Sequence, residues 1–581
     1  MHFASHFLSR SMLHFACLLG LGLSNLDAQS PHSMREWIER SEADRNTLEH
    51  RFRVPGDEAA RDQHHRVLQQ WLLELQGITY ANLDFDDQID YHLLKNDLQR
   101  NLARLQRERQ ADAAAMVFLP YGSGLIQLGL MRENVDNYTP SRLADHIDQL
   151  SAQIDQVRKQ HLKLDRSVLQ EQRIDRMAAL RAAELIDQWR RMLGELDRFY
   201  AGYDPLYSWW CENPVKKLQA SLTEHGQLIR REIVGVPEED KETIIGFPLG
   251  DSALREELKY EWIAHTPEEL IRIAEREFAW CDQQGEIAAR ELGFDGNWSR
   301  ALEHVKGLHV EPGQQPKMIR DLALEAIRFL EIHDLVTVPP LAQTGWRMDM
   351  MSPERQRVSP YFLGGPSIIV SFPTNTMSHD EKLMSLRSNN IHFSRATVQH
   401  ELIPGHHLQH YMTARYRPYR ESFSTPFWVE GWALYWEMLL WDLGFAKAPE
   451  DRIGMIFWRK HRCARIKFSL GYHLGQMTPE ECVQFLVDRV GHERSAAAAE
   501  VRRSIMGDYG PLYQAAYMLG GLQIRALHKE FVQSGQMTNR QFHDRILQEN
   551  SLPIELLRIR LRNEGVSQQA TASWRFADPL P

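Results

Sequence analysis

Cysteine is scarce in this chain, which has five Cys and 26 His among its 581 residues. The cysteines are scattered and no two form a CxxC pair, so the sequence shows neither a cysteine-ligated metal site nor a disulfide framework. If the chain holds a metal ion, imidazole is therefore the expected ligand rather than thiolate.

Basic charge is not in excess. The chain has 68 Lys and Arg against 78 Asp and Glu, which gives a formal net charge of −10. This balance argues against a dedicated nucleic-acid-binding protein, so no nucleic-acid partner is expected. With 43% hydrophobic and 25% charged residues, the composition also excludes wholesale disorder and a polytopic membrane protein.

A long apolar run is lacking as well. The segment SMLHFACLLGLGLS near the N-terminus has about 14 residues, fewer than the ~20 that a membrane-spanning helix needs. It follows one Arg and precedes a polar stretch with the small residue Ala28, a layout typical of a secretory signal peptide. We expect residues 1–28 to be removed, with a misassigned start codon or a short anchor as the alternative. Cys17 follows a poor lipoprotein box, so no lipid anchor is expected.

The mature chain is thus expected to be secreted or periplasmic, without an integral membrane segment. No flexible linker or fixed-period repeat divides it. Apolar residues recur at three- and four-residue intervals over residues 90–110 and 141–172, which indicates long helices. Residues 336–376 are rich in Pro, Gly and β-branched residues and predict a few short strands. We predict a single mainly α domain over residues 29–581, with its metal-site half at about 336–562.

The most informative stretch is SRATVQHELIPGHHLQHYMTARY, which contains His400, Glu401, His406 and His407. Glu430 follows in the apolar segment TPFWVEGWALYWEMLLWDLGF. Neutral imidazoles and a carboxylate suit Zn²⁺, and a site with three ligands leaves one position open for a catalytic water. A Glu directly after the first His can lie beside that water and act as its general base.

The spacing differs from the usual His-Glu-x-x-His motif, because the fourth position after His400 is Pro404. On a regular helix His406 would point about 120° away from His400, and His407 would lie about 10.5 Å along the axis. Pro404 cannot donate to the carbonyl of His400, and Gly405 tolerates unusual backbone angles. We therefore predict a helix broken at Pro404–Gly405 that returns one histidine to the metal side. The spacing alone leaves both His406 and His407 as candidates, and a solvated face beside a Pro-Gly turn as the alternative.

The segments His400–Gln409 and Glu430–Ala433 together resemble the bacterial proteins called domain of unknown function family 885. The resemblance extends to SIIVSFPTNT before them and to EVRRSIMGDYGPLYQAAYMLGGLQIRAL after them. That family is distantly similar to the all-α zinc peptidases of the thimet oligopeptidase and angiotensin-converting-enzyme type. The resemblance implies a large helical body with a deep cleft and a small β region beside the metal site.

The resemblance also implies roles for individual residues. The metal ligands would be His400, His406 and Glu430, since the first His after Pro-Gly is the more characteristic of the two. Glu401 would be the general base. Tyr517 would donate a hydrogen bond to the oxyanion, in preference to the other two tyrosines of YGPLYQAAY, with aromatic core packing as the alternative.

Further charged residues are open to two interpretations. Glu437 lies seven residues after Glu430 on the same helix face, where it could orient a metal-bound His or be solvated or paired with Arg. Arg503 and Arg525 could hold a substrate carboxylate or form structural ion pairs. His492 is followed by Glu but has no His four residues later, so we expect it to be structural. The segment GGPSIIVSFPTNT could offer a strand edge to an extended peptide or be a buried strand.

Together these features predict a secreted or periplasmic zinc-dependent hydrolase, a metallopeptidase that acts on short peptides. One alternative is a metal-dependent hydrolase of a non-peptide amide or ester. The other is a non-catalytic envelope protein whose metal site only stabilises the fold. The oligomeric state and the cleavage specificity stay open.

Overall fold

The computed structural model describes residues 33–162, 175–356, 359, 361–507 and 509–579. The predicted signal peptide, residues 1–28, lies outside the described residues. The described chain is mainly helical, with one small two-stranded sheet, which confirms the prediction of a mainly α fold with a small β region.

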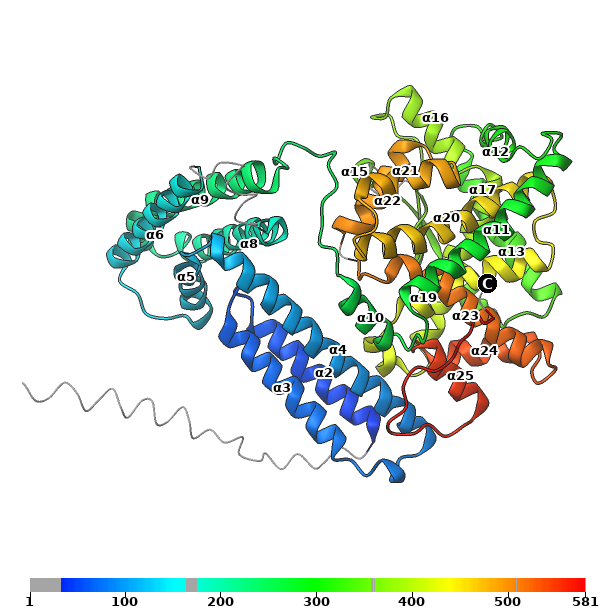
Figure 1. The fold of residues 1–581 in the computed structure, drawn as a ribbon, viewed down its shortest axis with the longest axis horizontal. Coiled ribbons are helices and arrows are strands. Elements are labelled where there is room, and N and C mark those ends of the chain that lie inside the picture. Colours follow the sequence, from blue (N-terminus) through cyan, green and yellow to red (C-terminus); the bar gives the residue numbers. More distant parts are fainter. Residues whose placement is uncertain (1–32, 163–174, 357–358, 360, 508, 580–581) are drawn as a thin grey trace, which may run out of the picture.

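The N-terminal helices form two groups that extend away from the rest of the molecule (Figure 1). The first group packs α2 and α3 along α4, and the second packs α6, α8 and α9 together beside the far end of α4. Each group has a hydrophobic core of its own. The elements are α2 (Met34–Arg51), α3 (Glu58–Gln76), η1 (Tyr80–Asn82), α4 (Phe85–Ala115), η2 (Met116–Phe118), α5 (Gly122–Asn134), α6 (Pro140–His161), α8 (Arg176–Ala201), α9 (Pro205–Leu228) and the π-helical turn η3 (Ile229–Val234).

The second half of the chain forms a larger body around the most extensive hydrophobic core. Its elements before the metal motif are α10 (Asp251–Tyr260), α11 (Pro267–Glu291), α12 (Trp298–Lys306), α13 (Gln315–Ile332), α14 (Pro340–Gly345), β1 (Arg347–Met350), α15 (Pro353–Gln356), β2 (Ser367–Val370) and α16 (His379–Ser388). The elements that follow are α17 (Ile391–Glu401), α18 (His406–Thr413), η4 (Pro418–Phe423), α19 (Pro426–Asp442), α20 (Pro449–His473), α21 (Pro479–Val490), α22 (Arg494–Met506), α23 (Tyr513–His528), the π-helical turn η5 (Lys529–Gln533), α24 (Asn539–Glu549) and α25 (Ile554–Arg562).

The small sheet lies within the region predicted to contain strands. Its strands β1 and β2 are parallel, with Arg347 opposite Ser367 and Met350 opposite Val370. The other edge of β2 is occupied at Ile369, which exchanges two backbone hydrogen bonds with Leu363. The edge that the sequence offered for an extended peptide is therefore already paired at this position.

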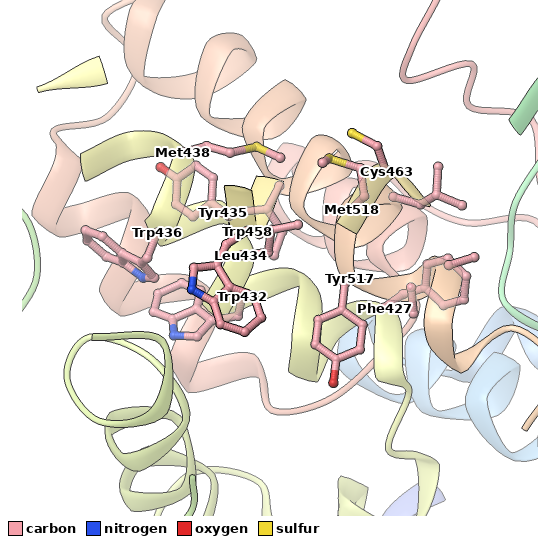
Figure 2. Packing of buried hydrophobic residues seen from close by; sticks show 14 of the residues in the cluster. Phe427, Trp432, Leu434, Tyr435, Trp436, Met438, Trp458, Cys463, Tyr517 and Met518 are labelled. Carbon is pink, nitrogen blue, oxygen red and sulfur yellow. The ribbon is translucent and has the colours of Figure 1, made fainter. Parts of the chain in front are cut away.

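Helices α19 and α23 cross at glycines, which brings two functional segments of the sequence together. A Cβ placed on Gly431 would lie 2.6 Å from the backbone of Gly520, so the two helices approach more closely than larger side chains would permit. The apolar sequence of α19 is buried nearly all round, as expected for a helix in the middle of a core. Figure 2 shows its Trp432 and Trp436 packed in the same cluster as Tyr517 of α23.

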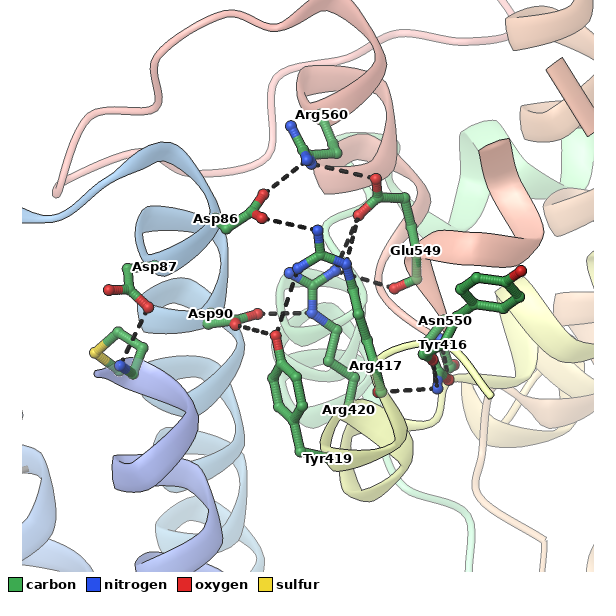
Figure 3. A network of polar contacts seen from close by, with 12 residues as sticks. Asp86, Asp87, Asp90, Tyr416, Arg417, Tyr419, Arg420, Glu549, Asn550 and Arg560 are labelled. Atoms are coloured by element: carbon green, nitrogen blue, oxygen red, sulfur yellow. Dashed lines mark hydrogen bonds and ion pairs between the residues drawn. The ribbon is translucent and has the colours of Figure 1, made fainter. Parts of the chain in front are cut away.

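A buried ionic network joins the start of α4 to the C-terminal body (Figure 3). Arg420 in η4 is fully buried, and its Nε donates to Oδ1 of Asp90 on α4 at 2.7 Å. Its Nη1 donates to the backbone oxygen of Glu549, the last residue of α24, at 3.0 Å. Asp86, one turn before Asp90, is paired with Arg560 of α25 at 2.7 Å. These pairs fix the N-terminal helices to the body at one end of α4.

A cavity of about 1390 Å³ lies where the second N-terminal group faces the body, between α4, α8, residues 236–249 and α22. It contains none of the predicted site residues, which line a separate cavity described below. Among the described residues no single helix is long and apolar enough to cross a membrane. One strongly bent pair, Phe85–Phe118 with Gly122–Asn134, meets that criterion of length and composition only when taken together.

Candidate metal centre

The segment that contains the predicted metal ligands His400 and His406 is divided between two helices. Helix α17 begins after Asn390, whose side-chain oxygen accepts from the N–H groups of the first turn, and it ends at Glu401. Helix α18 begins at His406, so the chain turns over the four residues between them. The helix break predicted from Pro404–Gly405 is confirmed.

Gly405 is required at this break by a close approach. Its φ of −77° is one that any residue adopts, but a Cβ at this position would collide with the carbonyl oxygen of His400. The turn is fixed from both sides, because the N–H of Gly405 donates to the carbonyl of Gln399 at 2.9 Å and the indole of Trp432 donates to that of Pro404 at 2.8 Å. Backbone contacts thus place His406 relative to His400.

The three residues predicted as metal ligands meet in space. One ligand atom from each of His400, His406 and Glu430 lies within 4.8 Å of the other two, and all three residues are buried. Oε2 of Glu430 lies 3.5 Å from Nε2 of His400 and 3.3 Å from Nε2 of His406. This atom has no hydrogen-bond partner among the described residues although it is buried.

His407 points elsewhere. Its Nε2 lies 3.0 Å from the backbone oxygen of Ala342, and its Nδ1 lies 3.3 Å from that of Gly365. Both ring nitrogens therefore contact backbone carbonyls of other segments. Of the two candidates that the spacing left open, the structure places His406 in the cluster and His407 outside it.

The second nitrogen of each clustered histidine has a partner. Nδ1 of His400 lies 2.7 Å from Oε1 of Glu437, and Nδ1 of His406 lies 3.5 Å from Oε1 of Gln409. These contacts leave Nε2 of both rings directed at Glu430. Glu437 also lies 3.6 Å from Nη2 of Arg462, so this carboxylate contacts both His400 and an arginine.

The pKa values of His400 and Glu430 are shifted by their neighbours within the cluster. Burial opposes the charged form of His400, but the neighbouring carboxylates of Glu430 and Glu437 raise the pKa of its imidazole to about 9. Burial likewise opposes ionisation of Glu430, yet the two histidines hold the pKa of this carboxyl well below its usual range. The hydroxyl of Tyr513 donates to Oε1 of Glu430 at 2.5 Å, a contact that the sequence did not single out from three neighbouring tyrosines.

Glu401 lines a cavity of about 330 Å³ together with the cluster. Burial raises the pKa of its carboxyl above the ordinary value. Gly364, just before β2, lies so close that a Cβ there would collide with the Glu401 side chain. The remaining walls come from α17, α18, α19, α20, α22, α23 and the segment around the sheet, including Tyr361, Leu363, Ile369, Thr397, His410, Trp458, Tyr509 and Tyr513.

Tyr517 also lines this cavity, and its ring stacks on that of His400 with 6.2 Å between centroids. Burial raises the pKa of its hydroxyl to about 12, so the group is protonated and able to donate. The guanidinium carbons of Arg462 and Arg465 lie 4.8 and 4.3 Å from the centroid of the same ring. Neither arginine was predicted as a site residue. Both belong to a helix with several other Lys and Arg residues, so no sequence pattern distinguished them.

Of the other residues singled out from the sequence, one lines the cavity and two lie elsewhere. Arg503 lines the cavity, whereas Arg525 does not and pairs with Asp442 at 2.7 Å on the surface. His492 is buried and hydrogen-bonded to His461 at 2.9 Å and to the hydroxyl of Tyr361 at 3.1 Å. It is therefore a packed core histidine, as expected.

Comparison with known proteins places this site in a family. Residues 44–561 match the family described as "Bacterial protein of unknown function (DUF885)". The chain belongs to this family. The match contains every residue of the cluster and its cavity, and no curated protein matches the chain.

Two solved structures share the fold at low identity. One, described as "a putative lipoprotein of unknown function" from Shewanella oneidensis, is 16% identical with a TM-score of 0.67 over 92% of this chain and 100% of its own. The other, "the putative lipoprotein" from Colwellia psychrerythraea, is 14% identical with a TM-score of 0.57 over 91% of this chain and 99% of its own. Members of this fold therefore retain its whole length while their sequences diverge.

Proposed function

We propose that this DUF885 protein is an exported zinc-dependent hydrolase of short peptides. The observation that carries the proposal is the meeting of His400, His406 and Glu430 beside Glu401 in one cavity. Export is supported by the signal-like N-terminal segment and by the names of the two structural neighbours. We also propose that the segment His400–Gln409 is distantly related to the zinc-binding motif of the all-α zinc peptidases.

The donor set fits a zinc ion. Ligands at about 2.0–2.1 Å from a tetrahedral Zn²⁺ lie about 3.3–3.4 Å from one another. The distances from Oε2 of Glu430 to the two Nε2 atoms are 3.3 and 3.5 Å, and Glu430 Oε2 has no other partner among the described residues. Two imidazole nitrogens and one carboxylate oxygen are also a ligand set typical of catalytic zinc sites.

The residues around the cluster can supply the rest of a hydrolytic reaction. A bound zinc ion would polarise a water molecule and the substrate carbonyl. Glu401, whose pKa is raised toward the range useful for proton transfer, would accept a proton from the attacking water and return it to the leaving amine. The protonated hydroxyl of Tyr517 would donate to the oxygen on which negative charge develops.

Metal analysis and peptide hydrolysis test this function on the same preparations. Purified protein should contain about one zinc ion per chain, and His400→Ala and His406→Ala should lose it, whereas His407→Ala should keep it. A mixed peptide library should be cleaved by the wild type, and Glu401→Gln should lower that rate by about 10²- to 10⁴-fold with the zinc retained. Glu493→Gln is the matched control, because it alters the other His-Glu pair of the chain at an exposed position.

The outcomes separate the alternatives. A wild type that binds no divalent metal contradicts the proposal. Hydrolysis of esters or non-peptide amides alone, with the same dependence on Glu401, would keep the mechanism and replace the substrate class. Stable zinc binding with no hydrolysis of any of these substrates, and chelation that unfolds the protein, would show a structural metal site.

A further inference from the structure

Of the four arginines that line the cavity of the candidate metal centre, Arg355 is exposed, and the other three have no function in the chemistry proposed above. Arg462 and Arg465 come from α20 and Arg503 comes from α22. The first two are almost completely buried, with side chains 6% and 3% exposed. Among the residues that line the cavity, only Glu401 and Glu430 are acidic, and Glu430 is assigned to the metal.

These arginines have more donors than the protein satisfies. Nε of Arg465 donates to Oε1 of Glu500 at 2.7 Å, but its buried Nη1 has no acceptor in the described part of the chain. The Nε atoms of Arg462 and Arg503 are also buried without a partner there. Unsatisfied buried donors are costly, and folded proteins generally avoid them.

Ion pairing within the protein does not account for the three charges. Glu500 is buried and pairs with Arg465, while Arg462 lies 3.6 Å from Glu437, which is already bonded to His400. Arg503 forms no ion pair with any described residue. Glu500 acts as a positioning residue, because it holds Arg465 by Nε and leaves Nη1 for another acceptor.

We propose that Arg462, Arg465 and Arg503 form a binding site for a substrate carboxylate beside the metal cluster. A carboxylate is acceptor-only and offers two oxygens, so it matches the planar fork of donors on a guanidinium. This inference rests on the proposed function, and it specifies the substrate as a short peptide that carries a carboxylate near the bond to be cleaved.

The position of the arginines determines how far the carboxylate lies from the bond to be cleaved. Arg462 and Arg465 contact the ring of Tyr517, and that ring stacks on His400. The guanidinium groups of Arg462 and Arg465 thus lie within about one aromatic side chain of the cluster, a distance that one to three residues of extended peptide can span at about 3.5 Å each. The free C-terminus of the peptide satisfies this geometry and would direct cleavage to its last residues. The side chain of Asp or Glu is the other source of the same chemistry.

Binding to metal-free protein tests the subsite independently of hydrolysis. The probes for titration calorimetry are N-acetyl-dialanine, its C-terminal amide, and N-acetyl-glutamate diamide, which carries only a side-chain carboxylate. We expect the free acid to bind at least about tenfold more tightly than its amide, since hydrogen bonds to charged groups contribute more than neutral ones. Tighter binding of the glutamate probe than of the free acid would support the subsite and assign it to acidic side chains.

Variants test whether the preference for the acid over the amide comes from these arginines. Arg503→Gln should remove the preference for the acid over the amide, and Arg525→Gln, on the surface outside the cavity, should keep it. Arg465→Lys retains the charge opposite Glu500 but lacks the planar fork, so it should reduce the preference even if Arg503→Gln does not fold. Equal affinity of the wild type for acid and amide would overturn this inference. A clear acid preference in a protein that cleaves no peptide would retain the subsite and reject the proposed function.

Discussion

Nδ1 of His400 lies 2.7 Å from Oε1 of Glu437, while Nε2 of the same ring faces Oε2 of Glu430 at 3.5 Å. The two glutamates are seven residues apart, which places them on one face of α19. One helix therefore supplies both a candidate ligand and the carboxylate that orients a second ligand. This arrangement fixes which nitrogen of His400 is available to a metal.

Glu437→Ala should lower zinc affinity by about 10- to 100-fold, because loss of a carboxylate that orients a ligating histidine has effects of that size. Competition against a chromogenic chelator measures the affinity directly. Glu493→Gln, an exposed change in another helix-end segment, should leave it unchanged. Unaltered zinc affinity in Glu437→Ala would show that this contact does not prepare the site.

Gly405→Ala should destabilise the protein and release the metal together. The added methyl group would collide with the carbonyl oxygen of His400, so the turn must open and carry His406 away from the cluster. We expect a loss of at least about 1–3 kcal/mol in the free energy of unfolding, as for other overpacked sites. Denaturant unfolding and metal analysis give the two measurements. Gly565→Ala, where no atom lies within 4 Å of the new methyl group, is the control and should change neither.

The segment around His400 shows which features of the site can be predicted from neighbouring residues alone. Pro404 and Gly405 predicted a broken helix because their constraints act on the backbone within one turn. The choice between His406 and His407 could not be made in this way. It depends on Ala342 and Gly365, whose backbone oxygens lie beside the ring nitrogens of His407 and which are far away in the sequence.

The arginines of the cavity and the separate cores of the N-terminal helices could not be predicted from local patterns either, because both depend on residues far away in the sequence. A buried Arg462 is indistinguishable in sequence from a solvated one until α20 is packed against α17 and α23. The hydrophobic period correctly predicted helices over residues 90–110 and 141–161, but not which helices pack together; residues 163–172 of the second prediction lie outside the described residues. Pairing between segments is set by the whole tertiary structure, so sequence periodicity does not contain it.

Arg420→Met should cost about 3–5 kcal/mol in the free energy of unfolding, since its removal leaves the buried carboxylate of Asp90 without its ion pair. Asp90 and Glu549 are each 1% exposed and would lose their contact with the guanidinium. Because this network joins α4 to the body, unfolding should also lose cooperativity between the two halves. Chemical denaturation followed by circular dichroism measures both effects. Arg415→Met, at an exposed position nearby, should stay within about 0.5 kcal/mol of the wild type.

His543 should make the protein sensitive to acid. This imidazole is fully buried on α24, where Nδ1 donates to the carbonyl of Leu335 at 2.7 Å and Nε2 accepts from the hydroxyl of Tyr435 at 2.8 Å. Burial lowers the pKa of His543 to about 3, below the ordinary value of 6.5. Between these two values the unfolded chain binds a proton that the folded chain does not, so the free energy of unfolding falls as the pH falls.

The contribution of one such histidine is about 1.4 kcal/mol per pH unit within that window. His543→Asn keeps a donor toward Leu335 but cannot take up the proton, so the slope of stability against pH between 6 and 4 should decrease by about one proton. Denaturant unfolding at several pH values measures that slope. Leu547→Ala, a buried change one turn later on the same helix, should lower stability at every pH without altering the slope. An unchanged slope in His543→Asn would mean that this imidazole binds its proton equally in the folded and unfolded states, which its complete burial between Leu335 and Tyr435 argues against.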